Sequence, residues 1–130
     1  MDEIWAEMYR AAAAVRGERA LSPYLEAGSV AAAVLSAEGR IYTGVCVDAC
    51  CGLGVCAERN AIFQLLTAGG GALRRVLVLM PDGTLGLPCG ACRELMMQLM
   101  PAEGKHIAFL LDTGEGRTVT LGELTPRWWI

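Results

Sequence analysis

The chain has 130 residues, of which 54% are hydrophobic and 19% charged, a composition typical of one packed domain and not of a disordered protein. Its net charge of −3 and its lack of a basic stretch argue against nucleic-acid binding. No apolar run reaches the ~18 residues that a membrane span needs, and the acidic start at Met1–Trp5 is a poor secretory signal. We therefore expect a single domain over residues 1–130, located in the cytoplasm.

The N-terminal third is predicted to form a helix followed by a β-hairpin. Apolar residues recur at helical spacing over residues 2–16. Residues 17–28 are predicted to be an irregular connection. The runs 29–35 and 41–47 are predicted strands, joined by a turn at residues 37–40 that contains a glycine.

The middle of the chain is predicted to alternate helices with a buried strand. Residues 55–68 carry apolar side chains at helical spacing, and three consecutive glycines follow. The continuous apolar run 76–80 is typical of a central strand that is covered on both faces. A third helix is predicted from Pro88 to about residue 100, because proline suits the first turn of a helix.

Two further strands, 106–111 and 117–120, are predicted to be antiparallel because only the short turn 113–116 joins them. A short turn over residues 121–124 follows, before the aromatic C-terminus. This order of elements predicts an α/β fold: a three-layer α/β/α sandwich around a mixed five-stranded sheet.

The cysteines are unevenly spaced. They are Cys46, Cys50, Cys51, Cys56, Cys89 and Cys92. Four of them crowd one segment and the last two form a C-x-x-C pair, which favours metal binding over the alternative of a disulfide framework.

Three of these cysteines fall at predicted helix starts: Cys56, Cys89 and Cys92. Helix N-termini stabilise thiolates, the form that binds zinc. Three thiolates leave one zinc position open for a water, and Glu58 is placed to move the protons of that water. The sequence therefore predicts a hydrolytic Zn²⁺ site. The alternative for Glu58 alone is a residue that only satisfies the helix dipole.

The thiolates would give the zinc site a net negative formal charge, which weakens the ion as a Lewis acid. Arg59 is the first candidate for a compensating charge next to the ligands, and Arg93 is the second. The alternative for each is an exposed helix residue. Cys50 and Cys51 are either buried small apolar residues or reactive thiols. The single histidine is expected to have no catalytic role.

The segments Cys56-Ala57-Glu58-Arg59 and Pro88-Cys89-Gly90-Ala91-Cys92-Arg93 resemble the paired signature of the cytidine deaminase superfamily. The nearest subgroups are the small free-nucleoside cytidine deaminases and the blasticidin-S deaminases. The resemblance implies the family fold, a Zn²⁺ cofactor, a homotetramer and a hydrolytic mechanism in which Glu58 moves protons from water to the ring and to the leaving ammonia.

The resemblance also implies substrate-binding positions. The backbone N–H of Ala57 and the carbonyl of Leu87 match positions that hold the edge of the base. Trp128 stands where the family has a C-terminal aromatic that closes over the pocket, sometimes that of a neighbouring subunit; core or interface packing is an equal alternative.

The sugar-binding positions depart from the family pattern. Cys46 stands where the family has an Asn that binds a ribose hydroxyl, and Asp48 stands where it has a Glu. A thiol is a poor hydrogen-bonding group, and Asp has a shorter reach than Glu. The family usually has an aromatic residue near the first strand, and the matching position here is Gly28.

We therefore predict zinc-dependent hydrolytic deamination of a small molecule: a cytosine nucleoside, cytidine or deoxycytidine, or a related aminopyrimidine. A deaminase of a blasticidin-S-like antibiotic or another modified heterocycle is the alternative substrate class. A non-catalytic, zinc-stabilised binding module is a second alternative, and Glu58 argues against it. An editing deaminase of nucleic acid is a third, which the acidic net charge disfavours.

Overall fold

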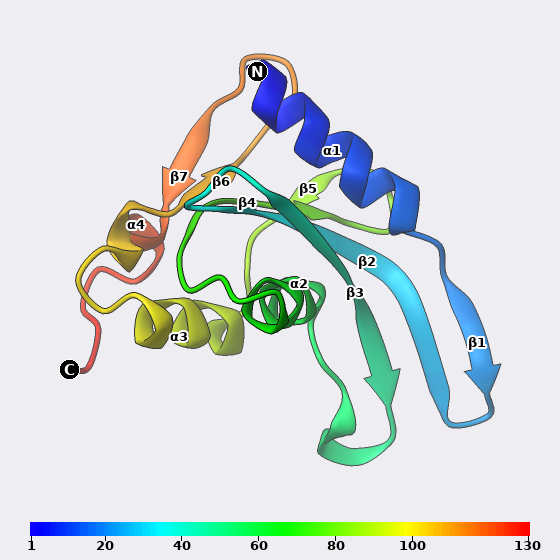
Figure 1. The fold of residues 1–130 in the computed structure, drawn as a ribbon. Helices are drawn as coiled ribbons and strands as arrows, with labels where there is room; N and C mark the ends of the chain where they lie inside the picture. The colour runs from blue at the N-terminus through cyan, green and yellow to red at the C-terminus, as the bar shows by residue number, and fades with distance from the viewer.

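The computed structural model describes residues 1–130 and consists of one mixed sheet with helices on both faces (Figure 1). Helix α1 (Glu3–Val15) covers one face, while α2 (Ala57–Thr67) and α3 (Gly90–Leu99) cover the other. This arrangement confirms the predicted three-layer α/β/α sandwich. The shorter helical segments are η1 (Cys51–Leu53), η2 (Gly104–His106) and α4 (Leu121–Leu124).

The sheet has seven strands. They are β1 (Arg19–Ser22), β2 (Leu25–Ser36), β3 (Ile41–Ala49), β4 (Leu73–Leu79), β5 (Leu85–Gly86), β6 (Ala108–Leu110) and β7 (Thr118–Thr120). The long strand β2 pairs with β1, β3 and β4, and the sheet continues through β6 to β7. Only β4 and β6 pair in parallel, and β7 is antiparallel to β6, as the short turn between them predicted.

Two strands were not predicted, and the prediction of an irregular connection over residues 17–28 is wrong. Strand β1 forms an antiparallel hairpin with the first residues of β2, and the two-residue β5 pairs with the end of β4. Every residue of β1 is exposed, so backbone hydrogen bonds form this hairpin without an alternation of apolar and polar side chains in the sequence. Strand β5 is too short to produce a pattern.

The core has two parts, one on each face of the sheet. On the α1 side, Trp5, Met8 and Ala12 pack against the sheet, and on the other side α2 and α3 contribute most of the apolar contacts. Alternate residues of β4 enter the two parts: Val76 and Val78 face α2 and α3, while Leu77 and Leu79 face α1. The prediction of a strand covered on both faces is therefore confirmed.

The closeness of α2 to β3 depends on Gly44. A Cβ atom at this position would lie 2.3 Å from the backbone nitrogen of Ala61 and 2.8 Å from the carbonyl oxygen of Ala57. Any larger side chain would push α2 away from the strand. Gly44 thus sets the distance between the start of α2 and the end of β3, where the candidate site lies.

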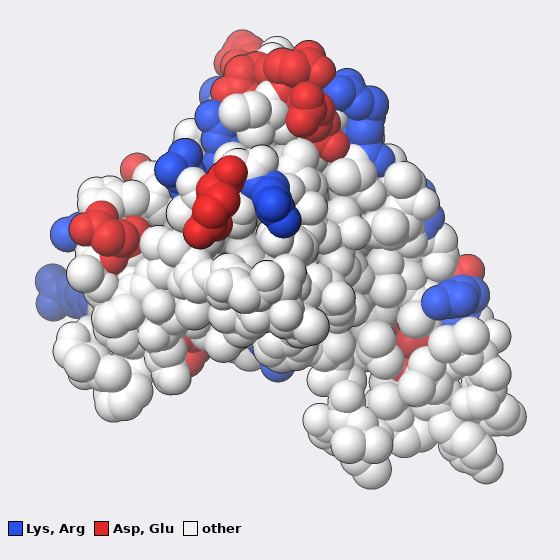
Figure 2. Space-filling model, in the orientation of Figure 1, with Lys and Arg blue, Asp and Glu red and all other residues white.

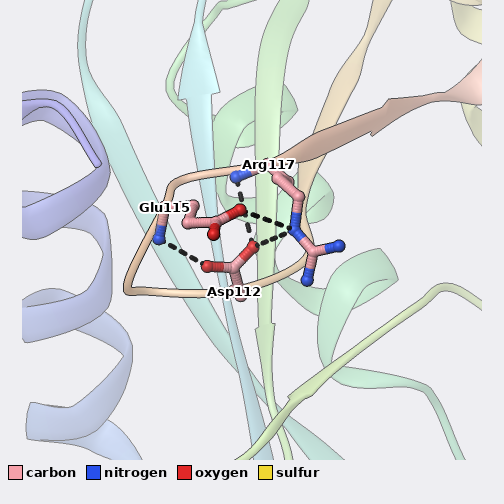
Figure 3. Close-up of polar contacts among 3 residues, drawn as sticks. All are labelled: Asp112, Glu115 and Arg117. Atoms are coloured by element: carbon pink, nitrogen blue, oxygen red, sulfur yellow. Dashed lines mark hydrogen bonds and ion pairs between the residues drawn. The ribbon is translucent and has the colours of Figure 1, made fainter.

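A polar turn joins β6 to β7 (Figure 3). The Asp112 carboxylate accepts the backbone N–H of Glu115 at 2.7 Å and the Nε–H of Arg117 at 2.9 Å. The Glu115 carboxylate also lies 3.5 Å from the Arg117 Nε. The turn is exposed, so these contacts fix its shape and contribute little to stability.

Every helix is too short or too polar to cross a lipid bilayer.

Candidate active site

The three predicted metal ligands come together at the N-termini of two helices. Cys56 is the N-cap residue of α2, Cys89 is the N-cap residue of α3, and Cys92 lies in the first turn of α3. The Sγ atoms of Cys56 and Cys89 are 3.4 Å apart, and those of Cys89 and Cys92 are 3.5 Å apart. All three sulfurs lie within 4.8 Å of one another.

These distances fit a zinc ion. A tetrahedral site with Zn–S bonds of about 2.3 Å places its sulfurs about 3.8 Å apart, close to the separations found here. Both helix N-termini present their positive ends to the sulfurs, which favours thiolates. The donor set therefore suits zinc and leaves one coordination position without a protein sulfur.

Without a metal, the pKa values of the Cys89 and Cys92 thiols are shifted in opposite directions. Burial opposes ionisation of Cys89, yet hydrogen bonds from the backbone N–H of Cys92 and the thiol of Cys56 lower the pKa of Cys89 overall. Burial, followed by the nearby Glu58 carboxylate, raises the pKa of the Cys92 thiol well above its usual range. A zinc dication between the sulfurs would offset the repulsion between the Cys92 thiolate and the Glu58 carboxylate, because metal binding favours the deprotonated ligand.

Glu58 lies in the first turn of α2, two residues after the ligand Cys56, and is 4% exposed. Burial raises the pKa of this carboxyl, and the Cys92 thiol and the Arg59 charge partly oppose that shift. A carboxyl group that is buried beside a metal site and lines a cavity is suited to proton transfer.

The two candidate arginines have different surroundings. The Arg59 guanidinium donates to the Cys56 Sγ at 3.5 Å, and this hydrogen bond is the main reason that the pKa of Arg59 is raised. Arg93 instead donates to the backbone carbonyls of Pro88 and Leu124, both at 3.0 Å. Arg59 is therefore next to a sulfur ligand, whereas Arg93 braces the start of α3 against α4.

A cavity of about 440 Å³ opens beside the sulfurs. Four of the five predicted substrate-binding residues line it: Cys46, Asp48, Ala57 and Leu87. Trp128 does not: its indole N–H donates to the Glu94 carboxylate on α3 at 3.1 Å.

One polar residue of the cavity lining, Ser29, was not predicted from the sequence. Ser29 lies at the end of the cavity formed by β2 and β3, and its Oγ lies 3.3 Å from the Cys46 Sγ. The same sulfur accepts the backbone N–H of Val30 at 3.3 Å, and the thiol donates to the Asp48 carboxylate at 3.8 Å. The available signal was weak: Ser29 is only the single polar residue at the start of an apolar strand.

Gly28 precedes this group, and any larger residue at this position would be strained. Its φ of +92° is in the left-handed region, and a Cβ atom would lie 2.1 Å from the carbonyl oxygen of Gly17. At the position where the family has an aromatic residue, the Gly17 backbone therefore occupies the space that a side chain would need.

Three other residues from the sequence analysis lie outside the cavity lining. Cys50 and Cys51 are exposed, so the alternative in which they are buried apolar residues is wrong: they lie where β3 ends and η1 begins. Cys51 also has a φ of 64°, which is rare for residues other than glycine. His106 is exposed and lies near Glu103.

Comparison with known proteins agrees with this geometry. The family model of the cytidine and deoxycytidylate deaminase zinc-binding region matches residues 4–105. A cytidine deaminase of Halalkalibacterium halodurans is 35% identical over 98 residues, which cover 75% of this chain and 74% of the relative. A cytidine deaminase of Mycobacterium tuberculosis is 33% identical over 99 residues, covering 75% of this chain and 70% of the relative.

Solved structures are similar over nearly the whole chain. The crystal structure of the Mycobacterium leprae cytidine deaminase has a TM-score of 0.76 and 31% identity, covering 97% of this chain and 100% of that one. The Burkholderia pseudomallei enzyme has a TM-score of 0.73 and 29% identity, covering 99% and 100%. The chain therefore belongs to the cytidine and deoxycytidylate deaminase family.

Proposed function

We propose that this protein is a zinc-dependent hydrolytic deaminase of a cytosine nucleoside, cytidine or deoxycytidine. The observation that carries the proposal is that three sulfurs lie at zinc-like distances, and that two of them, those of Cys56 and Cys89, border the same cavity as the buried carboxyl group of Glu58. Relatives at 33–35% identity are named cytidine deaminases, which supports this substrate class.

Cys56, Cys89 and Cys92 would hold the zinc, whose Lewis acidity makes water a nucleophile near neutral pH. Glu58 would take a proton from the attacking water and deliver it to the ring nitrogen. It would then assist the departure of ammonia from the ring carbon that the water attacked. Water and the cytosine ring thus give the uracil nucleoside and ammonia, with Glu58 returned to its starting state.

Three neighbouring groups would orient the reaction. The backbone N–H of Ala57 and the carbonyl of Leu87 both border the cavity and would hold the edge of the base. Arg59, through its hydrogen bond to the Cys56 sulfur, would draw negative charge away from the metal and keep it an effective Lewis acid.

The charges around the cavity favour an unphosphorylated substrate. Arg59 is the only Lys or Arg in the lining, and its guanidinium is bonded to Cys56. The lining also includes two carboxyl residues, Asp48 and Glu58. A phosphate group would meet two carboxyl residues and a single cation that already contacts a metal-ligand sulfur, so we propose a nucleoside in preference to a nucleotide.

Self-association into a homotetramer is part of the proposal. Phe63 and Leu66 on α2 are exposed, as is Trp129 at the C-terminus. Figure 2 shows few charged side chains over α2 and α3. An apolar exposed surface of this kind is typical of an interface. Light scattering after size-exclusion chromatography would give the number of subunits, and a monomer would contradict this part of the proposal.

We also propose a cytoplasmic location, because zinc-binding thiols persist in a reducing compartment.

The central test is ammonia release by the zinc-loaded protein from cytidine, deoxycytidine, blasticidin S, cytosine and guanine. We expect cytidine and deoxycytidine to be the best substrates. Turnover of blasticidin S alone would favour the alternative substrate class, for which the departures at Cys46 and Asp48 are the motivation. No turnover of any compound would contradict the proposal.

Glu58→Gln tests the proton-transfer step. We expect zinc to be retained and turnover to fall by about 10²- to 10⁴-fold, the usual contribution of general acid–base catalysis. Glu38→Gln, in the exposed turn between β2 and β3, is the matched control and should keep full activity. Unchanged activity in Glu58→Gln would remove Glu58 from the mechanism.

A further inference from the structure

The polar side chains that border the cavity form two groups. The cysteine cluster (Cys56, Cys89 and Cys92) supplies Cys56 and Cys89 to the first group, which also contains Glu58 and Arg59. These residues lie at the starts of α2 and α3. The second, which we call the strand-side group, consists of Ser29 on β2 and of Cys46 and Asp48 on β3. Proton transfer and metal binding need only the first group and Cys92, so the strand-side group is available for another part of the substrate.

Within the strand-side group, the hydrogen-bonding capacity of Cys46 is already used. Its sulfur accepts the Val30 N–H at 3.3 Å and lies 3.3 Å from the Ser29 hydroxyl. Its single S–H points to the Asp48 carboxylate at 3.8 Å. The residue is also 8% exposed. Cys46 is therefore placed to hold its two neighbours and has little capacity left for a ligand.

Ser29 and Asp48 keep free acceptor capacity. If the Ser29 hydroxyl donates to the Cys46 sulfur, both lone pairs of its oxygen remain available. The Asp48 carboxylate is exposed, forms no ion pair and has the weak thiol contact as its only side-chain hydrogen bond. The strand-side group thus presents acceptors to the cavity, and acceptors select a ligand that carries O–H donors.

We propose that Ser29, beside the predicted sugar-binding residue Asp48, accepts a hydrogen bond from a sugar hydroxyl of the nucleoside, and that Cys46 is a positioning residue that holds both side chains. This inference rests on the proposed function for the identity of the ligand. It differs from the sequence prediction in one respect: Ser29, and not Cys46, touches the substrate.

The test compares the binding of two nucleosides that differ only in their hydroxyl groups. The zinc-loaded Glu58→Gln protein is used because it should bind cytidine without deaminating it. Calorimetry on this protein gives the affinities for cytidine and 2′,3′-dideoxycytidine. Adding Ser29→Ala should weaken cytidine binding about 2- to 10-fold, the usual effect of one net hydrogen bond. Binding of dideoxycytidine should change less than twofold. Ser22→Ala, on the exposed strand β1, is the matched control.

Cys46 variants test the positioning role. Cys46→Ala removes the group that holds Ser29 and Asp48, so it should lower the affinity for cytidine while affecting dideoxycytidine much less. Cys46→Ser keeps a donor and an acceptor and should restore a large part of the lost affinity. A cavity effect alone would weaken both nucleosides equally in Cys46→Ala, and the serine would not restore the difference.

The possible outcomes separate this inference from the proposed function. Equal changes for both nucleosides in Ser29→Ala, or no change for either, would overturn the inference even if cytidine is deaminated. A weakening in Ser29→Ala that is confined to cytidine would support the inference even if the Glu58-containing protein releases no ammonia. That absence of turnover would refute only the proposed reaction. A folded, zinc-loaded protein that binds neither nucleoside would contradict both.

Discussion

The two ends of the cavity are built in different ways. At one end, backbone caps and the first turns of α2 and α3 place three sulfurs and Glu58 within a short distance of one another. At the other end, β2 and β3 carry the strand-side group, in which side chains are held mainly by one another. Helix starts fix side chains through the backbone, whereas the strand-side group depends on a network of weak bonds.

This difference suggests which end is easier to change without loss of the fold. Replacing one ligand of the cysteine cluster removes the metal and the link between two helices. Replacing Ser29 or Asp48 alters mainly hydrogen bonds near an exposed carboxylate, whereas replacing the buried Cys46 also leaves a small cavity. We therefore expect substitutions at the cysteine cluster to abolish activity, and substitutions at the strand-side group to change which substrate is preferred.

Cys89→Ala should have the largest effect. Loss of one sulfur should remove zinc, abolish turnover and lower the melting temperature, because the metal would join the starts of α2 and α3. Metal analysis and thermal unfolding measure these changes. Cys50→Ala, an exposed thiol outside the cavity lining, should keep its zinc. Stoichiometric zinc in Cys89→Ala would contradict the ligand set.

Gly28→Ala tests whether backbone contact fixes the strand-side end. The added Cβ would meet the Gly17 carbonyl at 2.1 Å with φ at +92°, so we expect the free energy of unfolding to fall by about 2–4 kcal/mol. Gly39→Ala is a matched control with a φ of +85° and no atom within 4 Å of the new Cβ. Equal losses in denaturant titrations would mean that the clash with Gly17 contributes nothing.

Arg59→Met should lower kcat/KM about 10- to 100-fold, as is usual when a partner of a metal ligand is removed. The zinc should stay bound, since all three sulfurs remain. Arg59→Lys should recover part of the activity by restoring the charge. Arg40→Met, in an exposed turn, is the control. Wild-type kinetics in Arg59→Met would show that its hydrogen bond to Cys56 has no role in catalysis.

Asp48→Asn should have the smallest effect. Amide replacement weakens one acceptor, so KM for cytidine should rise about 2- to 10-fold with kcat nearly unchanged. The ratio of kcat/KM for cytidine to kcat/KM for cytidine 5′-monophosphate should also fall, because the Asp48 carboxylate would no longer repel the phosphate. A wild-type preference for the monophosphate would contradict the proposed selection against phosphate.

Much of the fold followed from local patterns. The apolar run in β4 predicted a strand covered on both faces, and the short link between β6 and β7 predicted antiparallel pairing. The β1 hairpin was missed because all residues of β1 are exposed and leave no hydrophobic period. A strand that is held only by backbone hydrogen bonds has no signature in its side chains.

The sequence alone indicated which residues form the cysteine cluster, because helix starts and the spacing of Cys89 and Cys92 are local properties. Only the tertiary structure brought Ser29 beside Cys46, since that contact depends on the pairing of β2 with β3 across 17 residues of chain. It also placed Trp128 against Glu94 and not in the cavity lining. Local spacing therefore determined the predicted chemistry, whereas strand pairing decided which side chains surround the rest of the substrate.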